Sequence, residues 1–144
     1  MKLDWLILAN SAEEANGLVH MLGAGWDTIN VRAPLHEPDG SPSDIVAVVQ
    51  GTLIARLLLH PTETARDHPF ELTIVDEDGA TILKMEGAFR VDPSSAVPPS
   101  WDHGMNLVMP LTGLQLPRFG LYQVSLIVNQ THYGERPFRV VKAY

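Results

Sequence analysis

Four side chains that follow a long apolar segment have the chemistry of metal ligands. His60 and His68 flank Glu63 and Asp67. Zinc takes three or four ligands in fixed geometry, and its sites normally contain a close pair, such as His-x-His or two histidines four residues apart on a helix. The sequence has no such pair here. We therefore interpret these side chains as exposed loop residues and predict a protein without a metal or other cofactor.

An acidic run from Asp76 to Asp78 is followed by Gly79 and offers a second way to hold a cation. Calcium takes about six to eight oxygen ligands, so a second acidic loop, carrying Asp102 or Asp39, would have to lie beside this run. Asp-Gly is also a usual sequence for a tight hairpin turn. The turn alone accounts for the run, and a calcium site at Asp76, Asp78 and Asp102 is the alternative interpretation.

The signatures of an enzyme are missing. The chain has no cysteine and therefore no thiol nucleophile, and no serine lies in a Gly-x-Ser-x-Gly elbow. Gly23-Ala24-Gly25 leads into an extended segment and not into a phosphate-binding helix. A hydrolase would need a serine or histidine to meet a carboxylate in a cleft, and it is the least favoured alternative. The serines available are Ser11, Ser43, Ser94, Ser95 and Ser100.

Three tryptophans are candidates for a binding surface. Trp5 lies in an apolar segment and is predicted to be part of the core, because large aromatic side chains are usually buried. Trp26 follows a pair of glycines, and Trp101 ends a proline-rich stretch that contains Pro98 and Pro99. We predict a contact surface at Trp26, Pro98, Pro99 and Trp101, which binds a protein or, as an alternative, stacks against a glycan.

The overall charge limits the range of partners. Seventeen acidic against ten basic residues give a net charge of −7, and such a chain repels the phosphate backbone of nucleic acids. No apolar run approaches the roughly 20 residues of a membrane span. The run from Trp5 to Ala9 is shorter than the roughly 7–15 apolar residues of a signal peptide. We expect a cytoplasmic protein that binds neither nucleic acid nor membrane.

These side chains depend for their positions on a set of short strands. Apolar and polar side chains alternate clearly in residues 120–129, as in a strand with one face in a core. Residues 70–75 and 81–91 alternate in the same way around the Asp-Gly turn and predict a hairpin. Ser11 to Glu14 has the form of a helix capping box, which predicts one helical turn or a wide loop.

The longest apolar stretch, Ile45 to His60, is predicted to be a strand that is either central in its sheet or buried in an interface. Both of its faces are apolar, so both need cover. A second subunit packed on residues such as Leu58 would supply it, which favours a homo-oligomer or another protein partner. The prolines of residues 34–43 and 92–102 predict two long loops beside the strands.

About eight short strands, with little helix, predict an all-β fold in a single domain over residues 1–144. Gly120 and Tyr122 are spaced as in the tyrosine corner of Greek-key sandwiches. We therefore predict an antiparallel, immunoglobulin-like β-sandwich.

Three segments of the chain form a distinctive combination. They are residues 16–29, which contain Gly-Ala-Gly-Trp, the acidic turn at residues 76–79, and residues 119–126. With this combination the chain resembles a family of small, single-domain bacterial proteins of unknown function, and the similarity extends over most of its length. The resemblance implies a β-sandwich in one domain and carries over no catalytic residue.

The combined expectation is a non-enzymatic protein-interaction or assembly module. Its support is the absence of catalytic signatures, the two proline-rich loops and the two-sided apolar strand. A glycan- or calcium-binding β-sandwich is the alternative, and stabilisation by the ligand would distinguish it.

Overall fold

The computed structural model describes all 144 residues and contains twelve β-strands, one short 3-10 helix and no α-helix. One sheet has the strand order β1-β6-β9 and another the order β4-β12-β11-β7-β8, while β2 pairs with β3 and β10 pairs with β5. The bounds are β1 Lys2–Ala9, β2 Ser11–Ala15, β3 Leu18–Leu22, β4 Thr28–Val31, β5 Ala47–Val48, β6 Thr52–Leu59, the 3-10 helix Pro61–Glu63, β7 Asp67–Asp76, β8 Thr81–Arg90, β9 His103–Pro110, β10 Gln115–Leu116, β11 Gly120–Val128 and β12 Thr131–Lys142.

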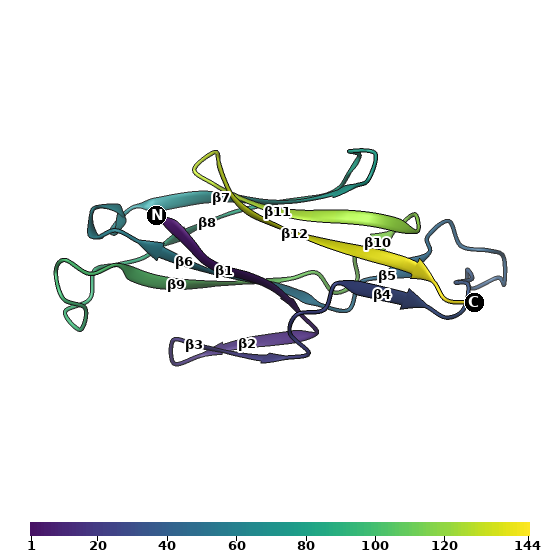
Figure 1. The fold of residues 1–144 in the computed structure, drawn as a ribbon, viewed down its shortest axis with the longest axis horizontal. Helices are drawn as coiled ribbons and strands as arrows, with labels where there is room; N and C mark the ends of the chain where they lie inside the picture. The colour runs from purple at the N-terminus through teal and green to yellow at the C-terminus, as the bar shows by residue number, and fades with distance from the viewer.

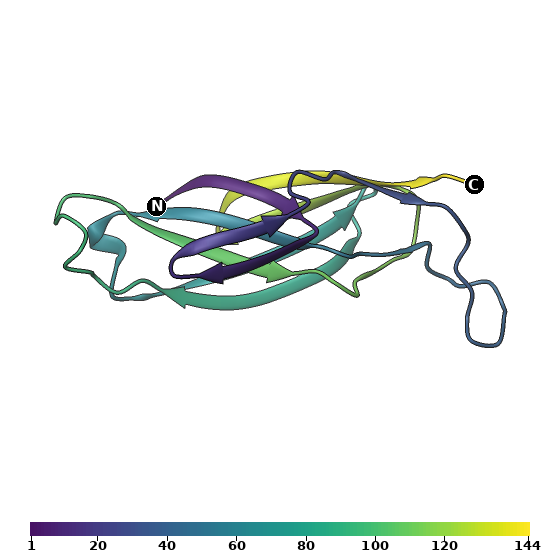
Figure 2. The same ribbon diagram turned by 90° about the horizontal axis from the view of Figure 1, so that it is seen from below.

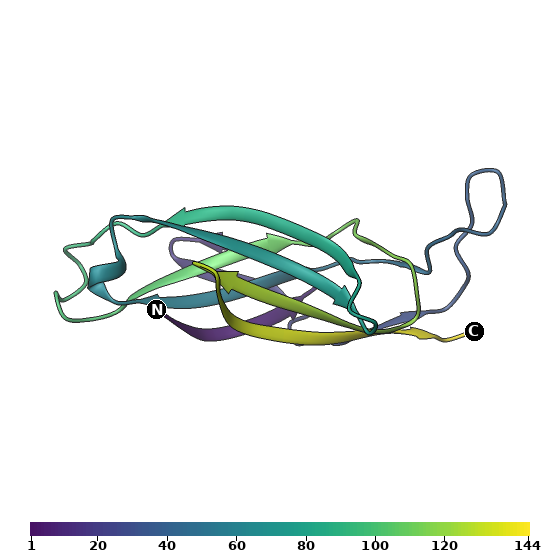
Figure 3. The same cartoon turned by 90° about the horizontal axis from the view of Figure 1, so that it is seen from above.

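The three-stranded and five-stranded sheets lie in two layers that face each other (Figure 1). Figure 3 views the five-stranded sheet from above, with β8, β7, β11 and β12 in front. Each sheet contributes its inward, alternate side chains to one shared core. Its fully buried members include Leu53, Leu57, Leu59, Leu72, Ile74, Leu116, Val124, Leu126 and Val128.

The prediction of an all-β fold is confirmed, and two of its details need correction. The structure has twelve strands where the sequence predicts about eight, because several strands are only two to five residues long. The strands are also not all antiparallel: β4 pairs with β12 in parallel, from Thr28 opposite Arg139 to Val31 opposite Lys142. The five-stranded sheet is therefore mixed.

Residues 11–22 form a hairpin, and the predicted helical turn or wide loop is wrong. Ser11 pairs with Leu22 and Ala15 with Leu18. Asn16 and Gly17 make the turn between them with φ of 54° and 76°. A two-residue Asn-Gly turn with positive φ at both residues matches the twist of the flanking strands, and this preference outweighs the capping pattern.

The apolar stretch at Ile45 to His60 forms two strands instead of one. The break falls before β6, at Gly51, where an added Cβ would lie 2.8 Å from the ring of Trp26. Strand β6 is central, as predicted, with β1 and β9 on either side. Its outer face is covered by the β2–β3 hairpin, which lies across this sheet (Figures 1 and 2) and buries Ile54 completely. The hairpin does not cover the whole outer face, because Leu58, further along β6, stays half-buried.

The predicted loops and the 70–91 hairpin are present. Strands β7 and β8 pair along their length around a turn in which Gly79 has a φ of 83°. The loop of residues 34–43 projects from one end of the molecule (Figures 2 and 3). No helix has the length and hydrophobicity needed to cross a membrane.

Candidate functional site

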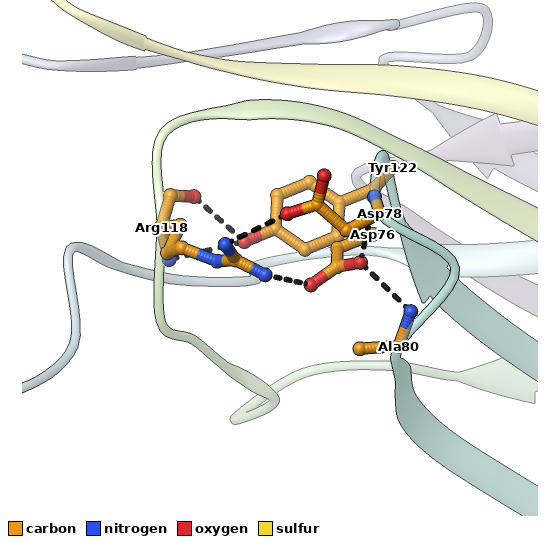
Figure 4. Close-up of polar contacts among 5 residues, drawn as sticks. All are labelled: Asp76, Asp78, Ala80, Arg118 and Tyr122. Carbon is orange, nitrogen blue, oxygen red and sulfur yellow. Dashed lines mark hydrogen bonds and ion pairs between the residues drawn. The ribbon is translucent and has the colours of Figure 1, made fainter.

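The carboxylates of the acidic turn, a possible calcium site in the sequence, bind the guanidinium of Arg118 instead. Arg118, in the segment that leads into β11, reaches both carboxylates: one terminal nitrogen pairs with Asp76 and the other lies 2.9 Å from Asp78 (Figure 4). The other oxygen of Asp76 accepts hydrogen bonds from the amides of Asp78 at 3.0 Å and Ala80 at 2.9 Å. Both aspartates of the turn are therefore paired with a cation from within the chain.

The side chain of Asp76 is almost fully buried, with 4% of its surface exposed. Burial opposes its ionisation, but the amide of Ala80, the guanidinium of Arg118 and the amide of Asp78 outweigh it, so the pKa of Asp76 is lowered. The hydrogen bonds that Arg118 donates to Asp76 and to Asp78, with that to Asp76 the stronger cause, raise the pKa of its guanidinium. The group stays ionised and acts as a structural clamp between the β7–β8 turn and the start of β11.

The structure does not bring Asp102 to this clamp. Asp102 precedes β9 at the end where β7 begins, whereas Asp76 ends β7. A ten-residue strand spans about 30 Å. Asp39 lies in the projecting loop and bonds Ser41. No group of three or more His, Asp or Glu side chains is placed to hold a metal ion.

The histidines after β6 have structural roles, and the interpretation of both as exposed is wrong for His68. His68 is 1% exposed and stacks on Phe89 with ring centroids 5.3 Å apart. Its Nε2 lies 2.6 Å from the backbone carbonyl oxygen of Glu63, and its Nδ1 lies 2.9 Å from the side-chain amide nitrogen of Asn129. A carbonyl only accepts, so Nε2 carries the proton and Nδ1 accepts from Asn129. His60 is exposed and caps the 3-10 helix through Nδ1.

The proline-rich loop between β8 and β9 forms the second feature. Trp101 is 65% exposed, and Pro98 and Pro99 are exposed beside it. The loop bounds a hollow of about 520 Å³. The hollow contains no charged side chain and is lined by Pro61, Thr64, Pro93, Ser94, Ser95, Ala96, Val97, Pro98, Pro99 and His103.

His103 is the unusual member of this hollow. Its side chain is 7% exposed, and neither ring nitrogen has a hydrogen-bond partner. Buried polar atoms are nearly always paired, and leaving one unpaired costs about 1–3 kcal/mol. The contrast with His68, where both ring nitrogens are paired, marks His103 as a group that the free chain leaves unsatisfied.

Trp26 lies in a different hollow, so the structure separates it from Trp101, Pro98 and Pro99. This third feature is a groove of about 500 Å³ between β1 and β12. Trp26 is half-buried and packs edge-to-face on Phe138, with ring centroids 5.8 Å apart. Trp5 is half-buried and lines the same groove, so its predicted place in the core is wrong.

Residues 4–141 match a family described as "Family of unknown function (DUF6941)". The chain belongs to this family. The match confirms the resemblance to a family of unknown function, and the DUF6941 region includes the acidic turn, the proline-rich loop and the groove. No curated protein matches the chain.

Sequence reasoning missed three residues of these features: Arg118, His103 and Arg136, which lines the groove beside Trp26. Arg118 lies 40 residues from Asp78, and the sequence contains no local signal for that pairing. The sequence holds one indication for His103. It lies two residues before the apolar Met105, and alternate residues of a strand share a face. That spacing places an imidazole on the inward face.

Proposed function

We propose that the chain is a non-enzymatic protein-interaction module that contacts its partner with the proline-rich loop of residues 92–102. The observation that carries this proposal is Trp101, which is 65% exposed in the loop that bounds an uncharged hollow. Tryptophan is enriched among the residues that dominate binding energy in protein interfaces, where a rigid aromatic ring fills a pocket or is itself enclosed. Pro98 and Pro99 add apolar, conformationally restricted surface next to it.

The unpaired imidazole of His103 supports the same proposal. A partner segment that enters the hollow supplies the hydrogen bonds that His103 lacks. Both ring nitrogens are buried, so the loop has to shift to expose them. Between Pro93 and Asp102, the loop's hydrogen bonds join only loop residues: Ala96 and Val97 to Ser94, and Trp101 to Pro98. A shift of the loop would therefore break no hydrogen bond to the core.

Site-specific photo-cross-linking in the native host tests the proposal. A photoreactive amino acid at Ala96, on the rim of the hollow, is expected to give one reproducible cross-linked protein. The same group at Glu86, which is exposed on β8, is the matched control and is expected not to give it. Trp101→Ala is expected to abolish the cross-link, whereas Leu121→Ala, at a side chain that is 54% exposed elsewhere, retains it.

Equal cross-linking from both positions, or a cross-link that survives Trp101→Ala, contradicts the proposal. A cross-link only to a second copy of the chain replaces the heterologous partner with self-association. The calcium alternative has no geometric support, because Asp102 lies far from the clamp at Asp76.

We also propose that the two-layer arrangement is an immunoglobulin-like sandwich. In such domains a tyrosine near the start of a late strand bonds the backbone a few residues upstream. The Tyr122 hydroxyl donates to the carbonyl of Arg118, four residues earlier, at 2.6 Å. The supporting features are this bond and the core that the two layers share. An experimental structure with a closed barrel, in which β1 bonds β12, would contradict this proposal.

A further inference from the structure

The groove beside Trp26 lies where β1 and β12 diverge. At one end the strands touch, because Gly134 leaves room for the side chain of Leu3. Further along they share no backbone pairing, and β12 pairs with β4 from Arg139 onward. The space between them is lined mainly by apolar side chains, among them Trp5, Ile7, Met21 and Trp26.

Two polar groups in this apolar groove have hydrogen-bonding capacity to spare. Arg136 donates from Nε to the carbonyl of Leu6 at 2.7 Å, which fixes the side chain across the gap between the strands. Its two terminal nitrogens have no hydrogen bond and no acidic partner. The indole N–H of Trp26 also has no acceptor, but it is buried, so a ligand in the groove reaches the exposed Arg136 and not this N–H.

From this combination we infer that the groove binds a small amphipathic carboxylate, whose apolar body lies against Trp26 and whose head group pairs with the terminal nitrogens of Arg136. The guanidinium presents parallel donors that match the two oxygens of a carboxylate. A ligand with an acyl chain or ring removes apolar surface of both partners from water. A volume of about 500 Å³ falls in the range of small-molecule sites.

The charges around the groove restrict the charge that the ligand can carry. The chain carries a net charge of −7, so an anion is retained only by a local cation. Asp27 lines the same groove, and its carboxylate accepts from the hydroxyl of Thr28 at 2.8 Å. A second negative charge on the ligand would be repelled by Asp27, which favours a monoanion. This site is separate from the proline-rich loop and does not depend on the function proposed for it.

Octanoate and 1-octanol are matched probes, because they share an eight-carbon chain and differ in the charged head group. Octanoate is expected to raise the melting temperature saturably, since a ligand of the native state stabilises it. It is also expected to shift the tryptophan fluorescence, because Trp5 and Trp26 line the groove. 1-Octanol is expected to bind roughly tenfold more weakly, about the contribution of one charge-assisted pair.

Arg136→Gln is expected to reduce octanoate affinity roughly tenfold and to leave 1-octanol binding unchanged. Arg139→Gln is the control, since Arg139 lies on the same strand and bonds Thr28 instead of facing Leu6. The inference is overturned if octanoate does not bind saturably, if both probes bind wild type equally, or if both variants bind octanoate alike. The comparison of probes on wild type needs no variant and decides the question even if Arg136→Gln fails to fold.

Discussion

The phenol of Tyr122 and the backbone of Arg118 are joined by two hydrogen bonds. The hydroxyl donates to the carbonyl at 2.6 Å, and its oxygen accepts from the amide at 3.1 Å (Figure 4). The ring stacks on Phe138 with centroids 5.2 Å apart. Burial raises the pKa of Tyr122, so the hydroxyl stays protonated and remains a donor at neutral pH. This contact fixes the segment that delivers Arg118 to the acidic turn.

Tyr122→Phe is therefore expected to lower the free energy of unfolding by about 1–2 kcal/mol, because it leaves two backbone groups without their partner. Urea denaturation measures the change. Tyr133→Phe is the matched control, since the hydroxyl of Tyr133 makes no hydrogen bond in the protein. Equal losses of unfolding free energy in the two variants would mean that the hydrogen bonds between Tyr122 and Arg118 do not stabilise the protein.

The clamp at Asp76 predicts a pH dependence of stability. The pKa of this carboxyl is lowered in the folded protein relative to 3.8, its ordinary value. A group with a depressed folded pKa stabilises the fold above its unfolded pKa and loses that effect as pH falls through its folded pKa. The melting temperature of wild type is thus expected to exceed that of Asp76→Asn at neutral pH, and the difference is expected to shrink below pH 3.8.

Asp102→Asn is the control for this titration, because Asp102 forms no hydrogen bond or ion pair. Its melting curve is expected to follow wild type at every pH. A difference between wild type and Asp76→Asn that stays constant down to about pH 2 would show that the carboxylate charge is not what Arg118 recognises.

Gly51 marks a close approach between the end of the β5–β6 connection and Trp26. An added Cβ would lie 2.8 Å from the indole ring and 3.0 Å from the carbonyl of Ala9. Gly51→Ala is expected to destabilise the protein by about 1–3 kcal/mol through overpacking. In a double-mutant cycle, Trp26→Leu is expected to relieve part of that loss, by at least about 0.5 kcal/mol. Strict additivity would place the strain at the Ala9 carbonyl instead.

His103 and His68 are expected to respond in opposite directions to the same substitution. His103→Leu removes two unpaired buried nitrogens and is expected to raise the unfolding free energy of the free chain by about 1 kcal/mol. His68→Leu removes two made hydrogen bonds and is expected to lower it by about 2–3 kcal/mol. A loss of stability in both variants would indicate that His103 is already satisfied in the free protein.

The strands of this fold could be predicted from the sequence where neighbouring residues alone determine them. Tyr122, Val124 and Leu126 alternate with polar residues, and all three are buried. The same locality explains the error at residues 11–15, where two local signals compete. The capping pattern begins at Ser11, but Asn16-Gly17 matches the twist of a hairpin, and packing on the neighbouring sheet favours the hairpin further.

The candidate sites were readable only in part, because their members come from distant segments. The exposure of Trp101 follows from its position after Pro98 and Pro99 in a loop. The pairing of Arg118 with Asp78 depends on the register of β11 against β7, which no local pattern specifies. The same holds for Arg136, whose partner Leu6 lies 130 residues earlier.

That separation of 130 residues has a consequence for how the protein is made. Synthesis delivers roughly 5–20 residues per second, so the first strand leaves the ribosome several seconds before the last one exists. The inward faces of β1 and β6 have no complete opposing layer until β11 and β12 emerge, because β11 and β12 join β7 to β4 in that layer. Nascent chains therefore spend most of their elongation time with half a core exposed, and chaperone demand should be concentrated in that interval.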